Sequence, residues 1–158
     1  MEAQTILTTL QEKFGAAVIE AKTDVLQPFA QIAPDKMPEI AAFLRDEPGL
    51  EFDYLSCISG VDYNDGKLGA VYHLGSIVNR HTIVLKAIVP KEDPRIASIA
   101  HLYGAANWHE REAFDMVGVV FEGHPDLRRI LCPDDWEGHP LRKDYKVQEF
   151  YQGIRVPY

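Results

Sequence analysis

The chain has 158 residues, of which 46% are hydrophobic and 25% are charged, values typical of a single folded domain with a buried core. Its formal net charge of −8 argues against nucleic-acid binding, because phosphates are bound by basic patches. The two cysteines, Cys57 and Cys132, are isolated, which favours reduced thiols over a disulfide framework. No apolar run reaches the roughly 20 residues of a membrane helix, so we expect neither a membrane span nor a signal peptide.

The N-terminal part is expected to alternate helices and short strands. Apolar residues at a 4-3-4 spacing predict an amphipathic helix that starts near Ala3 and ends at Gly15. Residues 16–21 and 28–32 favour short strands. A second helix is predicted after an Asp35 cap. Its apolar face would carry Met37, Ile40, Ala41 and Leu44.

The middle of the chain predicts antiparallel hairpins. Residues 52–62 are rich in aromatic and β-branched side chains, and residues 64–67 have turn composition. Residues 68–78 and 81–89 are expected to pair across a two-residue connection at Asn79-Arg80, which only antiparallel strands permit. We therefore expect a two-layer α+β fold whose mostly antiparallel sheet is covered by helices.

Two further helices are expected next. Asp93-Pro94 would start the first, whose buried face would hold Ile96, Ile99, Ala100 and Tyr103. Asn107 would cap the second, which is predicted to run from Trp108 to a left-handed turn at Gly118.

Charged residues divide this second helix into two faces. Arg111 and Asp115 lie opposite the apolar arc, four residues apart, where they can pair. His109 and Glu110 instead project inside the apolar arc. Because a buried carboxylate is costly without a partner, we expect Glu110 to pair with an arginine from residues 126–143. The candidates are Arg128, Arg129 and Arg142.

After residue 132 the periodicity of a core element is lost, and prolines interrupt the chain. We therefore divide the chain into an α+β domain, residues 1–132, and an extended C-terminal arm, residues 133–158. Such an arm either binds a partner through aromatic and arginine side chains or wraps over its own domain. Its aromatic residues are Trp136, Tyr145, Phe150, Tyr151 and Tyr158.

The residue patterns disfavour a catalytic or cofactor site. No histidine stands at metal-ligand spacing from another histidine or a cysteine. Glu110 and Glu112 project about 160° apart on a helix, so they cannot flank one bond as glycosidase carboxylates do. Cys57 has no histidine nearby in sequence, and we interpret it as a small buried hydrophobe on a strand. Phosphate-binding loops are absent, and two cysteines cannot ligate a four-cysteine cluster.

The segment from Glu110 to Tyr145 resembles the signature of the 30-kDa family of respiratory NADH:quinone oxidoreductase, whose bacterial members are the C-type subunits. The resemblance begins with Glu110, Arg111, Glu112 and Asp115. It continues with His124-Pro125, Arg128 and Arg129, and it ends with the Pro-Leu-Arg-Lys-Asp-Tyr run of residues 140–145.

The resemblance implies a non-catalytic subunit in the hydrophilic arm of a proton-translocating complex, bracing the 49-kDa-type subunit that helps to build the quinone pocket. FMN, iron–sulfur clusters and quinone are then expected on other subunits. Membrane association is expected only through the complex, at the cytoplasmic face of a prokaryotic membrane. The signature residues would be structural. The partner interface would include Arg142, Lys143, Asp144, Tyr145, Phe150, Tyr151 and Arg155.

Two alternatives remain open. The chain could have the same role in a related complex, such as a ferredoxin- or F420-fed dehydrogenase, a photosynthetic-type complex or a membrane-bound hydrogenase. The chain could instead be a freestanding acidic hydrolase, which would require Glu110 or Glu112 for turnover.

Overall fold

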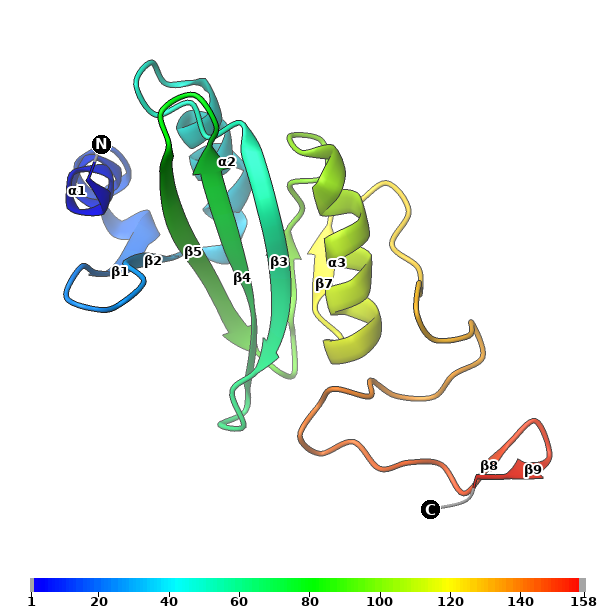
Figure 1. The fold of residues 1–158 in the computed structure, drawn as a ribbon. Coiled ribbons are helices and arrows are strands. Elements are labelled where there is room, and N and C mark those ends of the chain that lie inside the picture. The colour runs from blue at the N-terminus through cyan, green and yellow to red at the C-terminus, as the bar shows by residue number, and fades with distance from the viewer. Residues whose placement is uncertain (1, 157–158) are drawn as a thin grey trace.

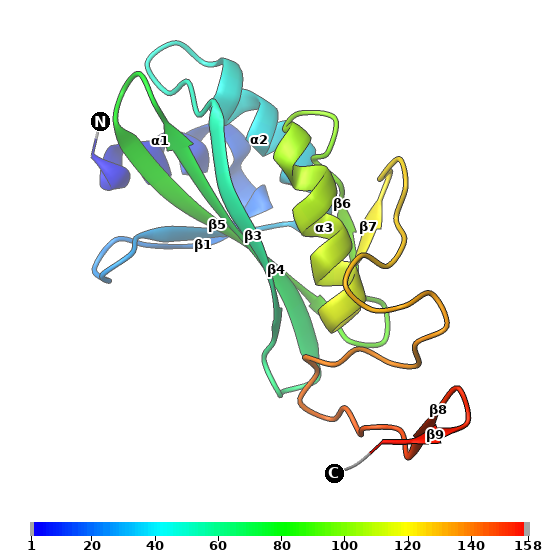
Figure 2. The same cartoon turned by 45° about the vertical axis from the view of Figure 1, so that its right-hand side comes forward.

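The computed structural model describes residues 2–156. A five-stranded sheet carries helices on one face, and a long C-terminal segment leaves this body beyond α3 (Figures 1 and 2). The helices are α1 (Ala3–Phe14), α2 (Met37–Asp46) and α3 (Gly104–Val117), with short 3-10 turns η1 (Gly15–Ala17) and η2 (Pro34–Lys36). The predicted α+β architecture with an extended arm is confirmed.

The main sheet has the order β1-β2-β5-β4-β3. Its strands are β1 (Val18–Lys22), β2 (Phe29–Ile32), β3 (Tyr54–Asp62), β4 (Lys67–Ser76) and β5 (His81–Pro90). Parallel pairing occurs between β2 and β5, and the other neighbours are antiparallel. The sheet is therefore mostly antiparallel, as predicted.

The core lies between this sheet and the helices. Alternate residues of β4 and β5 face the helices, because successive side chains of a strand point to opposite faces. The stripe predicted for α2 is fully buried. Asp35 is not its cap, however. The η2 turn runs directly into the helix, so Lys36 takes the N-cap position and no side chain caps the helix.

The predicted helix after Asp93-Pro94 is wrong. Residues Arg95–Ala97 form strand β6, which pairs in parallel with β7 (Val120–Glu122). Ile96 and Ile99 are nevertheless fully buried, as the spacing suggested. Ile96 is therefore buried in a strand that pairs with a distant segment, and a local helical pattern cannot reveal such pairing.

Two other boundaries differ from the prediction. Strand β4 ends at Ser76, so residues 77–80 form a longer turn in which Arg80 has a positive φ of 52°. Helix α3 begins at Gly104, and Asn107 therefore lies inside it. Gly118 does end α3 in the left-handed conformation, with φ 85°, and its N–H donates to the carbonyls of Ala113 and Phe114. No helix among residues 2–156 is long and apolar enough to cross a bilayer.

Candidate functional site

Asp115 is the centre of the junction between α3 and the following segment. Its buried carboxylate accepts a hydrogen bond from Arg129 Nη1 at 2.7 Å. The other carboxylate oxygen, Oδ2, accepts the backbone N–H groups of residues 130, 131 and 132 at 3.0, 2.7 and 2.8 Å. Burial raises the pKa of Asp115, but these hydrogen bonds outweigh burial and lower it below its ordinary value. The carboxylate therefore holds this loop on α3 as a structural anion.

The predicted ion pair between Arg111 and Asp115 is wrong. Arg111 donates instead to the carbonyl oxygens of Arg128, at 3.2 Å, and Arg129, at 3.1 Å. Both Arg111 and Asp115 are buried, because the segment after β7 folds back over the helix face predicted to meet solvent. The two side chains bind this segment and not each other.

Glu110 is fully buried, as predicted, but its partners are not arginines. Its carboxylate accepts the Ser98 hydroxyl at 2.6 Å and the Ile99 N–H at 2.8 Å. Burial raises the pKa of Glu110 to about 7, although both hydrogen bonds oppose that shift. With a pKa of about 7 this carboxyl group is mostly neutral below that pH, and its two hydrogen-bond donors take the place of a cation, which is the physical reason that the arginine prediction failed.

His124 lies beside the buried Glu110 carboxylate. Its Nε2 lies 4.0 Å from Glu110 Oε2, and both side chains are inaccessible to solvent. Nε2 lies 3.1 Å from the carbonyl oxygen of Asn107, and Nδ1 accepts the Asp126 N–H at 3.0 Å. These two bonds fit a neutral imidazole that carries its proton on Nε2.

The other signature residues lie on the surface. Glu112 and Pro125 are exposed, and Arg128 makes an exposed ion pair with Asp126 at 2.9 Å. Glu112 does not approach the buried Glu110 pocket. The structure therefore gives no pair of carboxylates arranged for acid–base chemistry on α3.

The C-terminal end of α3 is covered by two basic side chains from the arm. Arg142 Nε donates to Val117 O at 2.6 Å, and His139 Nδ1 lies 3.0 Å from Asp115 O. A cation is favourable here because the free carbonyls of a helix end carry partial negative charge. Burial lowers the pKa of His139, and the neighbouring arginines add to this effect. Arg142 was predicted to lie in the partner interface, which stays a prediction; the structure adds that it contacts the chain's own helix.

A second set of contacts ties the arm to the sheet. The Asp62 carboxylate, at the end of β3, accepts the Lys143 N–H at 2.9 Å. Asp144 pairs with Lys91 at 2.8 Å. Contacts with the domain thus continue past residue 132, the boundary expected from sequence, and extend to residue 144.

Beyond residue 144 the arm leaves the domain. It ends in a small hairpin of β8 (Phe150–Tyr151) and β9 (Ile154–Arg155), which lies away from the main sheet (Figures 1 and 2). Tyr151 contacts Trp136, with ring centroids 5.2 Å apart, and donates to Asp135 at 2.9 Å. Phe150 and Arg155 are exposed. Tyr158 lies outside the described residues.

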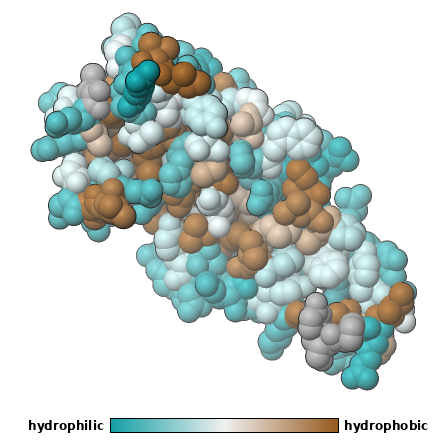
Figure 3. Space-filling view, viewed as in Figure 1, coloured by the Kyte–Doolittle hydropathy of each residue, from teal (hydrophilic) through white to brown (hydrophobic). Residues whose placement is uncertain are grey.

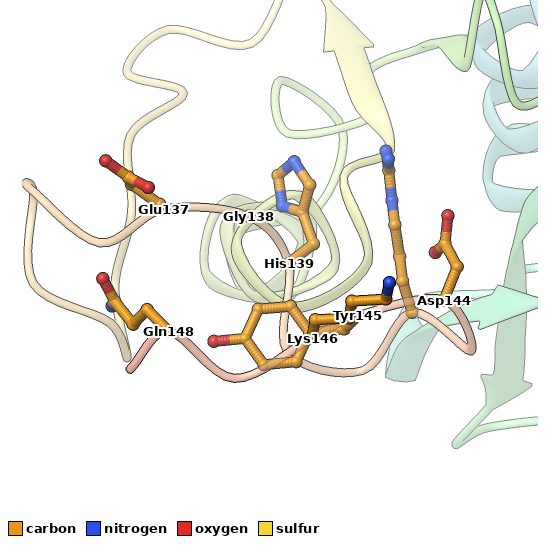
Figure 4. Close-up of a pocket in the computed structure, with 8 residues that line it drawn as sticks. Glu137, Gly138, His139, Asp144, Tyr145, Lys146 and Gln148 are labelled. Carbon is orange, nitrogen blue, oxygen red and sulfur yellow. The ribbon is translucent and has the colours of Figure 1, made fainter. Parts of the chain in front are cut away.

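The outer arm exposes apolar surface. Phe150 is 59% exposed and Ile154 73% exposed, and hydrophobic surface is visible toward this end of the molecule in Figure 3. The arm also contains an open concavity of about 410 Å³, lined by Tyr145, Lys146 and Gln148 with residues 137–139 (Figure 4). Figure 4 shows the Tyr145 ring among the side chains that line it. Within residues 2–156, no group pairs with the buried Tyr145 hydroxyl or with Gln148 Nε2.

One juxtaposition was missed by sequence reasoning. Cys57 Sγ lies 3.3 Å from His73 Nδ1, and Cys57 is only half-buried, so its interpretation as a buried hydrophobe is incomplete. The two residues are far apart in sequence but directly opposed on β3 and β4. Only the predicted hairpin register could have revealed the pair. In the part of the chain that the structure describes, no three histidine, cysteine or acidic residues are grouped to hold a metal.

Comparison with known proteins identifies the family. Residues 30–151 match the model of the respiratory-chain NADH dehydrogenase 30-kDa subunit. The chain belongs to this family. It is 55% identical to the C-type NADH-quinone oxidoreductase subunit of Chloroherpeton thalassium, over 94% of this chain and 63% of the relative. It is 50% identical to the C-type subunit of Chlorobium phaeobacteroides, over 99% of this chain and 96% of the relative.

Two solved structures share the fold. A trypsin-resistant fragment of Nqo5 has a TM-score of 0.64 at 28% identity and covers 77% of this chain and 98% of the fragment. A chain of an archaeal membrane-bound sulfane sulfur reductase has a TM-score of 0.73 at 24% identity. It covers 92% of this chain and 86% of the archaeal chain, and at this identity it shows likeness of fold alone.

Proposed function

We propose that this member of the 30-kDa subunit family is a non-catalytic structural subunit in the hydrophilic arm of a proton-translocating NADH:quinone oxidoreductase. It braces the 49-kDa-type subunit that helps to form the quinone pocket. FMN, iron–sulfur clusters and quinone lie on other subunits, and the chain reaches the cytoplasmic face of the membrane only through the complex. The names of its relatives support this proposal.

The observation that carries the structural role is the use made of the charged residues on α3. Asp115 and Arg111 bind the loop that follows β7, and Glu110 is enclosed by Ser98 and Ile99. A catalytic carboxylate must reach a substrate, whereas Glu110 and Asp115 are fully buried. These groups therefore fix the shape of the surface from which the arm departs, and a freestanding hydrolase has no support from their placement.

The arm is the proposed binding element. Residues 139–144 are held on α3 and the sheet, and this fixes the direction in which residues 145–156 project. The projecting part exposes the apolar side chains of Phe150 and Ile154. A neighbouring polypeptide would cover both of them. Phe150, Tyr151 and Arg155 are the proposed anchors.

Cross-linking of the complex, purified through a tag on this chain, tests the proposal. Amine-reactive cross-links from Lys143 and Lys146, on the arm, should lead to the 49-kDa-type subunit. Lys13, on α1, and Lys22, on β1, are internal controls and should not cross-link to the 49-kDa-type subunit. Purification without a 49-kDa-type subunit, or cross-links to it from the control lysines alone, would contradict the proposed role. Co-purification of subunits from a related dehydrogenase or hydrogenase would instead identify the alternative complex.

A further inference from the structure

Cys57 and His73 form a polar pair on the sheet face that the helices leave open. Their positions on β3 and β4 are directly opposite, so their side chains lie on the same face. The next residues, Ile58 and Tyr72, point into the core and are buried. Alternation along each strand therefore places Cys57 and His73 away from the helices. The short distance, 3.3 Å from Sγ to Nδ1, lets the imidazole accept the thiol proton.

The pair has open space beside it. His73 lines two surface cavities, of about 360 and 540 Å³, which share Leu26 and Val84 as walls. Cys57 and His73 are both only half-buried. A small molecule that entered either cavity would meet the imidazole of His73. The thiol of Cys57 does not line the cavities but lies 3.3 Å from this imidazole, on the neighbouring strand.

The second cysteine, Cys132, lies beside an acidic group and not beside a base. Burial raises the pKa of the Cys132 thiol, and the negative charge of Asp115 raises it further. Cys132 also lies in the loop held by Asp115, with its N–H bonded to that carboxylate at 2.8 Å. A thiol that must lose its proton beside an anion reacts slowly as a nucleophile. The chain thus carries its own control for the reactivity of Cys57.

We propose that Cys57 and His73 form a thiol-modification site that takes a low-molecular-weight disulfide. His73 Nδ1 accepts the proton of Cys57, and the sulfur attacks one sulfur atom of the disulfide. The bond between the two sulfurs of the reagent breaks as the bond to Cys57 forms. The leaving thiolate takes the proton from His73 and departs as a thiol, so Cys57 is oxidised and half of the reagent is reduced. A reducing pool of small thiols reverses the reaction, which limits the adduct to oxidising conditions.

Kinetics with 5,5′-dithiobis(2-nitrobenzoate) test this site on the purified full chain. Cys132→Ser leaves Cys57 as the reporter, and Cys57→Ser leaves Cys132. We expect Cys57 to react at least about tenfold faster at neutral pH, and His73→Asn to slow it by about tenfold. His101→Asn, at an exposed histidine away from β3 and β4, should leave the rate of Cys57 unchanged. In urea the two cysteines should react at similar rates, because the contact with His73 is lost.

A second measurement does not depend on any variant. Brief treatment of the wild-type chain with oxidised glutathione, followed by peptide mass mapping, should place the adduct on Cys57, and dithiothreitol should remove it. Equal labelling of both cysteines would overturn the proposal. So would an unchanged Cys57 rate in a His73→Asn chain whose circular dichroism and melting temperature match those of the parent.

Discussion

The Asp115 carboxylate and the Arg129 guanidinium meet at 2.7 Å, and they join the end of α3 to the segment that leads into the C-terminal arm. Three consecutive backbone N–H groups converge on the same carboxylate. Arg142 and His139 then cover the end of the helix one turn further on. The direction of the arm is therefore set by hydrogen bonds to one helix, although the arm itself has little regular secondary structure.

Replacing Asp115 with Asn should destabilise the chain by about 3 kcal/mol, because Arg129 loses its buried anion and the loop N–H groups lose charge-assisted bonds. Urea unfolding measures this. Asp126→Asn, which breaks an exposed pair with Arg128, is the control and should cost under about 1 kcal/mol. Because the pKa of Asp115 is lowered in the folded state, its contribution is complete above the unfolded pKa, about 3.9, and is lost as pH falls through the folded pKa. Equal effects of the two substitutions at pH 7 would contradict the role of Asp115.

The contribution of Glu110 to folding stability should depend on pH in the opposite direction to that of Asp115. Its pKa in the folded chain, about 7, lies above the unfolded value of about 4.3, so the folded state holds more protons between these limits. The stability of the wild type relative to Glu110→Gln should therefore fall by roughly 3 kcal/mol as pH rises from about 4.3 to about 7. Denaturant unfolding of both chains at a series of pH values measures this difference. A difference that stays constant with pH would show that Glu110 keeps an ordinary pKa.

Glu110→Ala separates the observed contacts from the predicted arginine pair. The substitution leaves the Ser98 hydroxyl and the Ile99 N–H without an acceptor, each worth roughly 1–3 kcal/mol when buried. We expect Ser98→Ala to cost less in the Glu110→Ala chain than in the wild type, because the bond between Ser98 and Glu110 is already absent there, whereas the bond from the Ala100 N–H to Ser98 is lost in both. A reduced cost of removing Arg129 instead would support the arginine pair, against the geometry.

Gly118 and Gly123 form a matched pair for testing how closely the arm packs on α3. Both have positive φ values, 85° and 81°, so either change to Ala costs about 1 kcal/mol in backbone strain. A Cβ at Gly118 would also collide with Arg142 and His139, whereas one at Gly123 meets open space. Gly118→Ala should therefore lower the melting temperature clearly more than Gly123→Ala. Equal losses would mean that Arg142 and His139 do not rest on the helix end.

Much of the fold was predictable because its signals are local. The stripe of α2, the turn at residues 64–67 and the left-handed end of α3 at Gly118 each depend on neighbouring residues, and each is present. The helix predicted in place of strand β6 arises from the helical spacing of Ile96, Ile99 and Tyr103. The partner strand β7 lies more than 20 residues away, and pairing at that distance leaves no local pattern.

The site was harder to predict for the same reason. The signature residues were identified, but Arg111 and Asp115 were placed on a solvent face because nothing local shows that residues 128–132 fold over it. The Cys57 and His73 pair depends on the register of two strands. The contact of Arg142 with the free carbonyls at the end of α3 was not predicted, because 25 residues separate it from Val117 in the sequence and no local pattern shows that the two meet.

Proteolysis tests whether the outer arm is separate from the domain. Lys146 is exposed and lies in irregular structure between the Asp144 contact and the terminal hairpin. We expect trypsin to cut there early, while sites in the sheet and helices resist. Early cleavage within β4 or β5 would contradict this expectation.

The central claim is that the outer arm serves assembly and not the stability of its own domain. The most direct measurement compares the full chain with a chain lacking residues 146–158, both in melting and in tagged co-purification with the rest of the complex. We predict that the truncated chain melts within about 2 °C of the parent, since even 1 kcal/mol would shift a domain of this size by roughly 2–4 °C, and that it fails to recover the 49-kDa-type subunit. A truncated chain that melts well below the parent, or one that melts normally and still recovers that subunit, would contradict the account.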